Sequence, residues 1–446
     1  MISDTITAIS TASGVASISI VRVSGADALK VASQVAPNAN LTPRLATLTP
    51  FLDGNGVMID QGIIIYFQAP KSFTGEDIVE FQCHGGVAVA QEILDSTIQA
   101  GARLATPGEF SKRAFLNGKI DLSKAEAIAK IVEAKSSDAI RILARQLKGE
   151  LGDFVEEARE SILEMIAHSE VMIDYAEEDI PEDILDGLRA KLESLRERLE
   201  TILASSLRRR GLIEGFKLAI VGKPNVGKSS LLNSILNYER AIVSPIAGTT
   251  RDTIEESIRV GSHIIRVVDT AGIREAKDEI EKIGVGRSIE SIEEADIVVA
   301  LFDSSRDFDE DDQDILEILE KNSEKEIITL LSKSDLEPKI DLQRLEKLEP
   351  IRITKEQIKP FLDKLERVLD SFGTDEELIL SSSRQIDIVR STIESIDSAI
   401  EPLAREELEF FSYHLQEAVA KLSQITKPYE SEQILDKMFS EFCLGK

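Results

Sequence analysis

The most informative segment of the sequence is Gly222-Lys223-Pro224-Asn225-Val226-Gly227-Lys228-Ser229, which follows the apolar run 216–221. A buried strand here leads into a loop whose glycines turn backbone N–H groups toward an anion, and the next helix adds its positive dipole end. In such a loop Lys228 reaches the β- and γ-phosphates of a nucleotide and the Ser229 hydroxyl binds Mg²⁺. Since this spacing also arises by chance, a plain glycine turn before a helix stays open until other parts are found.

Two later segments supply those parts. Asp269-Thr270-Ala271-Gly272 follows an apolar run, where the carboxylate can hold a metal-bound water and the Gly272 N–H can sense the γ-phosphate. Between the two motifs lies Ala247-Gly248-Thr249-Thr250-Arg251-Asp252, a loop of small residues that is suited to a switch segment in which Thr250 caps the magnesium. Three parts in this order exclude chance and predict a nucleoside triphosphate site.

The choice of base depends on Ser332-Lys333-Ser334-Asp335. GTP-binding proteins carry Asn-Lys-x-Asp after this strand, and the Asp accepts from both the ring N–H and the exocyclic amine of guanine. Because adenine presents no matching pair of donors, Asp335 predicts GTP selectivity. The Asn that normally braces the loop and touches the base is replaced by Ser332, so we also expect weakened affinity.

The residue that orients the attacking water is missing from its usual place. Ras-like switches have a Gln directly after Asp-x-x-Gly, whereas this chain has Ile273. An isoleucine cannot orient water, so another group must do it. Residues 274–284 offer many charged candidates, and a solvated switch helix remains the alternative for each of them.

The pattern of apolar residues predicts a multidomain chain. Residues 6–117 read as short strands with helices at 91–99 and 109–116, which indicates an α+β domain. Long amphipathic helices follow, beginning with a capping box at Ser123 and Glu126, and the helical pattern resumes after residue 374. Between the helical blocks, six strand-like runs alternate with helices, as in an α/β sheet. These strands are expected at 216–221, 254–260, 264–269, 297–302, 327–331 and 351–353.

We therefore expect four segments. They are an N-terminal α+β domain at 1–118, the first part of an all-α helical domain at 119–210, an inserted α/β P-loop GTPase domain at 211–373 and the second helical part at 374–446. Such an insertion is tolerated because the ends of a compact domain often lie close together at its surface.

Composition limits the function classes. The 446 residues carry 80 acidic and 52 basic side chains, a net charge of −28, so any nucleic acid must meet a local patch or a partner. The compact basic cluster Arg208-Arg209-Arg210 is either such a patch or a solvated helix end. No apolar run approaches the ~18 residues of a membrane span, and the N-terminus lacks a secretory signal, so we expect a cytoplasmic protein without a membrane partner. The acidic run 307–314 is expected to be a solvated loop.

The two cysteines, Cys83 and Cys443, predict no disulfide framework. Cys443 is either a nucleophile or a small apolar residue that packs in the interior. We favour packing for both cysteines, because no base lies beside Cys443 and because neighbours on a strand, as in Cys83-His84, point to opposite faces.

The chain resembles the MnmE (TrmE) family of bacterial tRNA-modification GTPases over its whole length. The resemblance rests on the motifs at 222–229, 248–252 and 269–272 and on the closing Phe442-Cys443-Leu444-Gly445-Lys446. Further matching motifs lie in the N-terminal domain, at 21–25, 73–77, 84–86, 107–110 and 113–117.

The resemblance implies a fold and a cofactor. The N-terminal domain would bind 5-formyltetrahydrofolate or a related tetrahydrofolate and form a homodimer, and the GTPase domain would be inserted into a discontinuous helical domain. The residues that match the family's folate site are Arg22, Glu80, Lys119 and Lys446. A pterin edge offers paired donors to a carboxylate, and a glutamate tail attracts cations.

The resemblance also implies a catalytic device in place of the missing Gln. Asn225, Ser244, Ile246 and Thr249 would bind K⁺ when two GTPase domains dimerise, while Ser229 and Thr250 hold Mg²⁺. Glu281 would orient the water, and Arg274 is a nearby switch residue, so the catalytic set is Glu281, Asn225, Lys228 and Arg274. The expected GTP contacts are Asn225, Val226, Gly227, Lys228, Ser229, Ser230, Ser244, Pro245, Ile246, Ala247, Gly248, Thr249, Thr250, Asp269, Thr270, Ala271, Gly272, Lys333 and Asp335.

The function implied is a K⁺-dependent GTPase that works with the FAD- and NADH-using partner MnmG in a heterotetramer. Together they would install an aminomethyl or carboxymethylaminomethyl group on carbon five of the wobble uridine of tRNA, with a folate one-carbon unit. The alternative from another class is a GTP-gated assembly or RNA-chaperone switch whose N-terminal domain only binds partners.

Overall fold

The computed structural model describes residues 4–12, 14–134, 136–174, 182–238, 256–267, 292–373, 377–427, 432–440, 442 and 445. The chain divides into two compact units. Unit 1 comprises residues 1–132, 146–192 and 391–446, and unit 2 comprises residues 133–145 and 193–390. Within the described ranges, no helix is both long and apolar enough to cross a bilayer.

Unit 1 begins with an α+β arrangement. Its elements are β1 (Ile6–Ile9), β2 (Ile18–Ser24), α1 (Ala28–Val35), β3 (Thr47–Leu52), β4 (Met58–Phe67), β5 (Ile78–His84), α2 (Val87–Gln99), β6 (Arg103–Leu104) and α3 (Glu109–Leu116). The six strands form one sheet in the order β3-β4-β5-β2-β1-β6, antiparallel except for the β1–β6 pair. The prediction of an α+β domain is confirmed.

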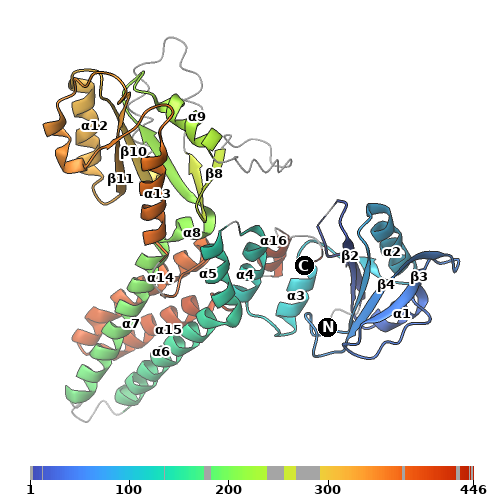
Figure 1. Cartoon of the computed structure of the whole chain (residues 1–446). Helices are drawn as coiled ribbons and strands as arrows, with labels where there is room; N and C mark the ends of the chain where they lie inside the picture. Colours follow the sequence, from blue (N-terminus) through green and yellow to red (C-terminus); the bar gives the residue numbers. More distant parts are fainter. Residues whose placement is uncertain are drawn as a thin grey trace. The chain divides into compact units, whose positions relative to one another are not determined.

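The alternation of side chains along β2 and β5 gives the sheet two different faces. Val21 and Phe81 lie in the core with residues of α1 and α2, which cover one face (Figure 1). Because strand side chains alternate with a period of two, Arg22 and Glu80 belong to the opposite face. Two of the expected folate residues, Arg22 and Glu80, therefore lie on that second face.

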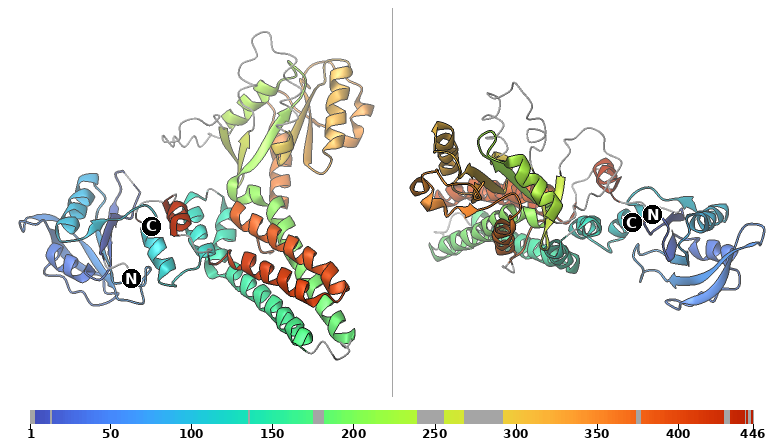
Figure 2. Two further views of the ribbon diagram at one scale, coloured as in Figure 1. Left: turned by 180° about the vertical axis from the view of Figure 1, so that it is seen from behind. Right: turned by 45° about the horizontal axis from the view of Figure 1, so that its top comes forward.

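The helical segments outside the two sheets come from two separate stretches of sequence. They are α4 (Leu122–Glu133), α5 (Ser137–Lys148), α6 (Glu150–Asp174) and α7 (Glu182–Arg208), followed much later by α14 (Ser383–Ala404), α15 (Leu408–Ser423) and α16 (Glu432–Ser440). Within unit 1, α6 packs along α15, and α16 lies beside α3 of the N-terminal part (Figure 2). The expected pairing of distant helical segments is therefore confirmed.

The capping box expected at Ser123 and Glu126 is wrong. Helix α4 begins at Leu122, one residue before Ser123. The cap is Asp121, whose carboxylate accepts from the Lys124 backbone N–H at 2.8 Å and from the Ser123 hydroxyl at 2.6 Å. A carboxylate just before the first turn is the better acceptor, so the Ser123 hydroxyl donates to it.

Unit 2 contains the expected α/β sheet. Its elements are α8 (Arg210–Glu214), β7 (Phe216–Val221), α9 (Lys228–Tyr238), β8 (Glu256–Val260), β9 (His263–Val267), β10 (Ile297–Asp303), α12 (Glu310–Lys321), β11 (Glu326–Ser332), the short 3₁₀ turns η1 (Leu342–Arg344) and η2 (Glu346–Leu348), β12 (Ile351–Arg352) and α13 (Lys359–Ser371). The strand order is β12-β11-β10-β7-β9-β8, parallel except for the β8–β9 hairpin. Helices α9 and α13 cover one face and α12 covers the other (Figure 1).

The acidic run differs from expectation. The run 307–314 is not a solvated loop, because Asp309 caps α12 and Asp312 is buried in its first turn. The arginines fit the helix-end alternative better than a cationic patch: α7 ends at Arg208, Arg209 is buried near Glu377, and Arg210 pairs with Glu214 at 2.7 Å. The buried Asp312 pairs with Lys223, and the buried Arg209 pairs with Glu377. Short-range charge patterns did not reveal these pairs, since the two members of each lie far apart in sequence.

Candidate functional site: a phosphate-binding loop and a second, N-terminal site

The loop 222–227 lies where β7 ends and α9 begins. Three of its residues have positive φ, namely Gly222 at 155°, Asn225 at 62° and Gly227 at 110°. At Gly222 a Cβ would lie 2.6 Å from the Leu301 carbonyl oxygen, so only glycine fits there. The sequence therefore bends the backbone sharply between strand and helix, as a nest for an anion requires.

Protein groups hold the carbonyl oxygens of this loop. Lys228 Nζ donates to the carbonyls of Gly222 and Lys223, the latter at 3.1 Å. The Ser332 hydroxyl lies 2.6 Å from the Val226 carbonyl, and Lys333 Nζ lies 3.0 Å from that of Asn225. With its acceptors tied to the protein in this way, the loop can offer its N–H donors to a ligand.

Lys228 is a cation prepared for an anionic ligand. Burial lowers the pKa of its ammonium group. Within the described ranges its partners are two carbonyl oxygens, and no carboxylate pairs with it. A phosphate placed on the loop would supply the missing negative charge, so Lys228 fits the role expected from sequence.

The segment 332–335, which is expected to contact the base, is tied to the same loop. The Lys333 ammonium bridges the Asn225 carbonyl and the buried Asp303 carboxylate, the latter at 2.6 Å. Burial alone would raise the pKa of Asp303, but hydrogen bonds from Lys333 and Ser305 outweigh it and lower the pKa. Asp335 is exposed two residues further on, where a base can reach its carboxylate. The structure thus brings Asn225, Lys333 and Asp335 to the same edge of the sheet.

Many expected site residues lie outside the described residues. They are Ser244, Pro245, Ile246, Ala247, Gly248, Thr249, Thr250, Asp269, Thr270, Ala271, Gly272, Arg274, Glu281 and Lys446. Asn225, Val226, Gly227, Lys228, Ser229 and Ser230 are described, and all six belong to the loop or to the first turn of α9. Of these, Asn225, Ser229 and Ser230 have exposed side chains.

The expected folate residues Arg22 and Glu80 form an ion pair. They are register partners on β2 and β5, and their side chains meet at 2.8 Å. The Arg22 guanidinium also lies 5.7 Å from the Phe110 ring centre and 6.0 Å from that of Phe73. An arginine, a carboxylate and two aromatic rings on one sheet face can hold a planar polar ligand.

Two other observations concern the same face. Lys119 packs against Gly75, because a Cβ at Gly75 would lie 3.1 Å from Lys119 Cε. Gly445, next to the expected Lys446, accepts a hydrogen bond from the Ser10 hydroxyl at 3.1 Å, just after β1. The loop 73–77 therefore lies between Arg22 and Lys119, and Gly445 lies at the end of β1.

A buried ion network joins three of the N-terminal motifs, and sequence reasoning missed it. Arg113 is only 1% exposed and donates to Asp4, Glu76 and Glu109. Glu109 also binds Arg103, with 2.7 Å between Nη2 and Oε1. Burial opposes ionisation of Glu109, but the hydrogen bond from Arg103 leads the interactions that lower its pKa to about 2. These motifs hold the domain together.

Cys83 is a packing residue, as expected. It lies in the core of the N-terminal sheet, and its thiol points to the Ser19 carbonyl. Burial raises the pKa of the thiol to about 11, so it stays protonated and unreactive near neutral pH. Cys443 lies outside the described residues.

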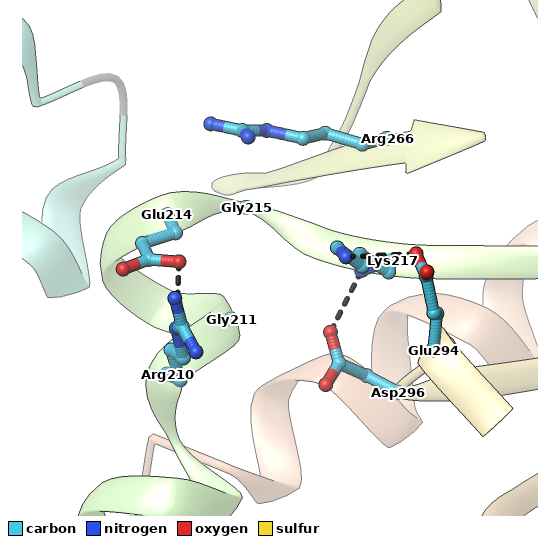
Figure 3. Close-up of a pocket in the computed structure, with 8 residues that line it drawn as sticks. All are labelled: Arg210, Gly211, Glu214, Gly215, Lys217, Arg266, Glu294 and Asp296. Carbon is cyan, nitrogen blue, oxygen red and sulfur yellow. Dashed lines mark hydrogen bonds and ion pairs between the residues drawn. The ribbon is translucent and has the colours of Figure 1, made fainter. Parts of the chain in front are cut away.

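A cavity in unit 2 does not belong to the nucleotide site. It has a volume of about 140 Å³ and lies at the start of β7, whereas the phosphate loop follows the end of that strand (Figure 3). Its lining carries the Arg210–Glu214 and Lys217–Glu294 ion pairs, and the Lys217 N–H donates to Asp296 at 2.7 Å. Ligand pockets usually measure about 300–1,000 Å³, so this cavity is too small for a nucleotide.

Two family models match the chain. The model of the MnmE helical domain matches residues 122–443, and the model of the GTP-binding protein TrmE N-terminus matches residues 5–119. Among solved structures, Era in complex with MgGDPNP and nucleotides of 16S ribosomal RNA is 23% identical, covers 40% of this chain and 66% of its own, and has a TM-score of 0.25.

Curated relatives match over the full length. The tRNA modification GTPase MnmE of Sulfurovum sp. is 60% identical over 444 residues, 99% of each chain. The proteins of the same name from Aliarcobacter butzleri and Sulfurimonas denitrificans are 56% and 55% identical, covering 99% and 100% of this chain and 99% and 100% of their own. With these matches on a chain that carries the phosphate loop described above, the chain belongs to the MnmE family of tRNA modification GTPases.

Proposed function

We propose that this GTPase hydrolyses GTP in a K⁺-dependent manner and, with the FAD- and NADH-using partner MnmG, modifies carbon five of the wobble uridine of tRNA. The group installed would be aminomethyl or carboxymethylaminomethyl, with the carbon taken from a tetrahydrofolate. The observation that carries the GTPase part is the loop 222–227, whose carbonyls are tied to the protein around a buried Lys228. The proposed domains are the N-terminal domain at 1–118, the two parts of the helical domain at 119–210 and 374–446, and the GTPase domain at 211–373.

The described residues fit a guanine nucleotide with Mg²⁺. In this proposal Lys228 holds the β- and γ-phosphates, while Ser229 and Thr250 bind Mg²⁺. The exposed Asp335 accepts from guanine, and the Lys333 bridge between Asp303 and Asn225 keeps the base segment next to the phosphate loop. Asp269 and Gly272 complete the site from the switch segment.

The described part of the K⁺ site also fits. Asn225 has a backbone fixed at φ 62°, a carbonyl held by Lys333 and an exposed side chain that can offer its amide oxygen to a cation. Ser244, Ile246 and Thr249 would supply the other oxygens, since K⁺ prefers oxygen ligands. The bound cation would neutralise charge that develops in the transition state. Glu281 would orient the water, with Arg274 close by.

The second face of the N-terminal sheet fits a folate. When bound, 5-formyltetrahydrofolate carries the one-carbon unit. Glu80 would accept from the pterin edge, and Arg22, which lies near the rings of Phe73 and Phe110, would hold Glu80 in place. Lys119 and Lys446 would attract the anionic tail.

Exposed apolar residues on the same sheet support a homodimer. Leu48 and Ile63 are register partners on β3 and β4 and are 66% and 38% exposed, and Met58 nearby is 60% exposed. Contiguous exposed apolar side chains mark association surfaces. We propose that a second copy covers them and that two MnmG chains complete a heterotetramer that acts on tRNA in the cytoplasm.

The alternative is a GTP-gated assembly or RNA-chaperone switch without modification chemistry of its own. Two measurements separate it from our proposal. Purified protein should retain or bind 5-formyltetrahydrofolate, and tRNA from a deletion strain should lack the modified wobble uridine. Normal wobble uridines in that strain would remove the modification function and leave the switch.

A further inference from the structure

Lys223, the second residue of the phosphate-binding loop, points away from the ligand side. Its side chain is only 6% exposed. Its ammonium lies 2.6 Å from Asp312 Oδ2 and 2.9 Å from Asp309 Oδ2, both in the acidic run that begins α12. A lysine of the loop thus makes a buried contact with a helix whose N-cap lies 86 residues later in the sequence.

The carboxylates of Asp309 and Asp312 are also held by contacts within the first turn of α12. Asp309 is the N-cap of α12 and accepts from the Asp312 N–H at 3.2 Å, while Asp312 accepts from the Asp309 N–H at 3.3 Å. This capping box locks both side chains onto the first turn of the helix. Asp312 is 1% exposed, so it is a rigid, desolvated anchor.

The charged states of Lys223, Asp309 and Asp312 depend on each other. Burial raises the pKa of Asp312, and Lys223 opposes that rise. The hydrogen bond from Lys223 lowers the pKa of the more exposed Asp309, and the two carboxylates together raise the pKa of Lys223 against its burial. The ammonium and its anchor therefore form one unit, and removing either side leaves a buried group without its partner.

The backbone of Lys223 connects this anchor to the ligand side. Its carbonyl accepts from Lys228 Nζ at 3.1 Å, and its neighbour Gly222 supplies the other carbonyl partner of Lys228. When the Lys223 side chain is fixed on α12, the Lys223 backbone is fixed as well. The carbonyls of Gly222 and Lys223, which hold Lys228 Nζ, then stay in place.

We propose that Lys223 is a positioning residue that holds the phosphate-binding loop in its ligand-ready shape by tying it to Asp309 and Asp312 of α12. The proposal rests on the assignment of residues 222–229 as the phosphate site. Because the loop amides contact phosphates that GDP and GTP share, loss of the tie weakens both nucleotides. Once a nucleotide is bound, its phosphates themselves hold Lys228, so the chemical step stays largely intact.

The test compares variants of the full chain by the dissociation constants of GDP and a non-hydrolysable GTP analogue and by kcat at saturating GTP. Lys223→Met should raise both dissociation constants about tenfold, equivalent to about 1.4 kcal/mol, and change kcat less than about twofold. Lys223→Arg, which can still bridge two carboxylates, should bind nearly as well as wild type. Lys217→Met is the matched control, because Lys217 is on the same strand-loop unit but pairs with the exposed Glu294.

A second variant separates positioning from general stability. Lys223→Met leaves Asp312 buried without its cation, so its melting temperature should fall, and adding Asp312→Asn should recover part of that loss. If Lys223 positions the loop, nucleotide affinity stays weak in the double variant. Wild-type affinity in Lys223→Met, or affinity restored in the double variant, would overturn the inference. A separate result would refute the assignment of residues 222–229 as the phosphate site: wild type and Lys228→Ala would then bind GDP with equal affinity.

Discussion

The Ser332 hydroxyl lies 2.6 Å from the carbonyl oxygen of Val226, which joins the base-recognition segment to the phosphate-binding loop. The Ser332 hydroxyl oxygen also lies 3.1 Å from the Phe302 carbonyl oxygen. Since a hydroxyl has one hydrogen, we assign it to the shorter contact, with Val226. Ser332 is buried, so this bond is made in a dry environment. A serine can therefore brace the loop from the position where related GTPases carry an asparagine.

The bond predicts opposite effects for two substitutions of Ser332. Ser332→Ala removes the donor to a buried carbonyl and should weaken GDP binding about fivefold or more, because an unsatisfied buried acceptor costs about 1–3 kcal/mol. Ser332→Asn restores a side chain that can also touch the base and should tighten binding. Isothermal titration with GDP measures both. Equal affinity of Ser332→Ala and wild type would show that the brace has no role in binding.

Asp335 should decide the choice of nucleotide. Asp335→Asn replaces the acceptor of two guanine donors with a group that complements the second carbonyl of xanthine, so preference should move from GTP to xanthosine triphosphate. Steady-state hydrolysis of both nucleotides gives the ratio of kcat/KM values. A variant that still prefers GTP would remove Asp335 from the base site. Exposed Asp341, the cap of a nearby 3₁₀ turn, offers a control substitution that should leave the ratio unchanged.

The stability of the N-terminal domain should depend on Glu109. Its pKa is lowered from 4.5 to about 2 in the folded state, so its ionised form stabilises the fold fully above pH ~4.5, and that contribution is lost as pH falls toward 2. At neutral pH, Glu109→Gln should cost about 3 kcal/mol. Its unfolding free energy should also vary less than that of wild type between pH 5 and 2. Urea unfolding followed by fluorescence or circular dichroism at several pH values tests this.

A matched substitution controls for the general effect of losing a carboxylate. Glu92→Gln changes an exposed residue on α2 of the same domain and should alter the unfolding free energy by less than about 0.5 kcal/mol. If Glu109→Gln behaves like Glu92→Gln, the buried network around Arg113 does not stabilise the domain as described.

Folate binding should depend on the ion pair between Arg22 and Glu80. Arg22→Ala and Glu80→Gln should each weaken binding of 5-formyltetrahydrofolate about tenfold or more, because each removes a charged partner on the second face of the sheet. Lys30→Ala, on α1 against the other face, should bind as wild type does. Fluorescence or calorimetric titration gives the constants, and unchanged affinity in both site variants would place the folate elsewhere.

Local patterns predicted the elements but not the long-range contacts. The strand 216–221 and the helix 109–116 were predicted with the bounds that the structure has, since an apolar run before a glycine loop and a Glu-led amphipathic turn are local signals. The pairing of Lys223 with Asp312 joins residues 89 apart, which no local pattern reveals. The acidic run consequently appeared to be a loop.

The N-terminal site shows the same limit in another form. Arg22 and Glu80 were expected from the family resemblance, and strand alternation then explains why they share a face. The motifs that contain Glu76, Glu109 and Arg113 are equally specific, yet their buried ion network is visible only in the structure. An individual charged residue in a sequence does not show whether it meets a ligand or another side chain.

We propose that a potassium ion completes the GTPase site in place of the missing glutamine, with Asn225 among its ligands. The rate of GTP hydrolysis by the full chain in KCl and in NaCl at equal ionic strength tests this. We expect hydrolysis to be about tenfold or more faster in KCl, since a cation that fits the site stabilises transition-state charge. Equal rates in the two salts would contradict it.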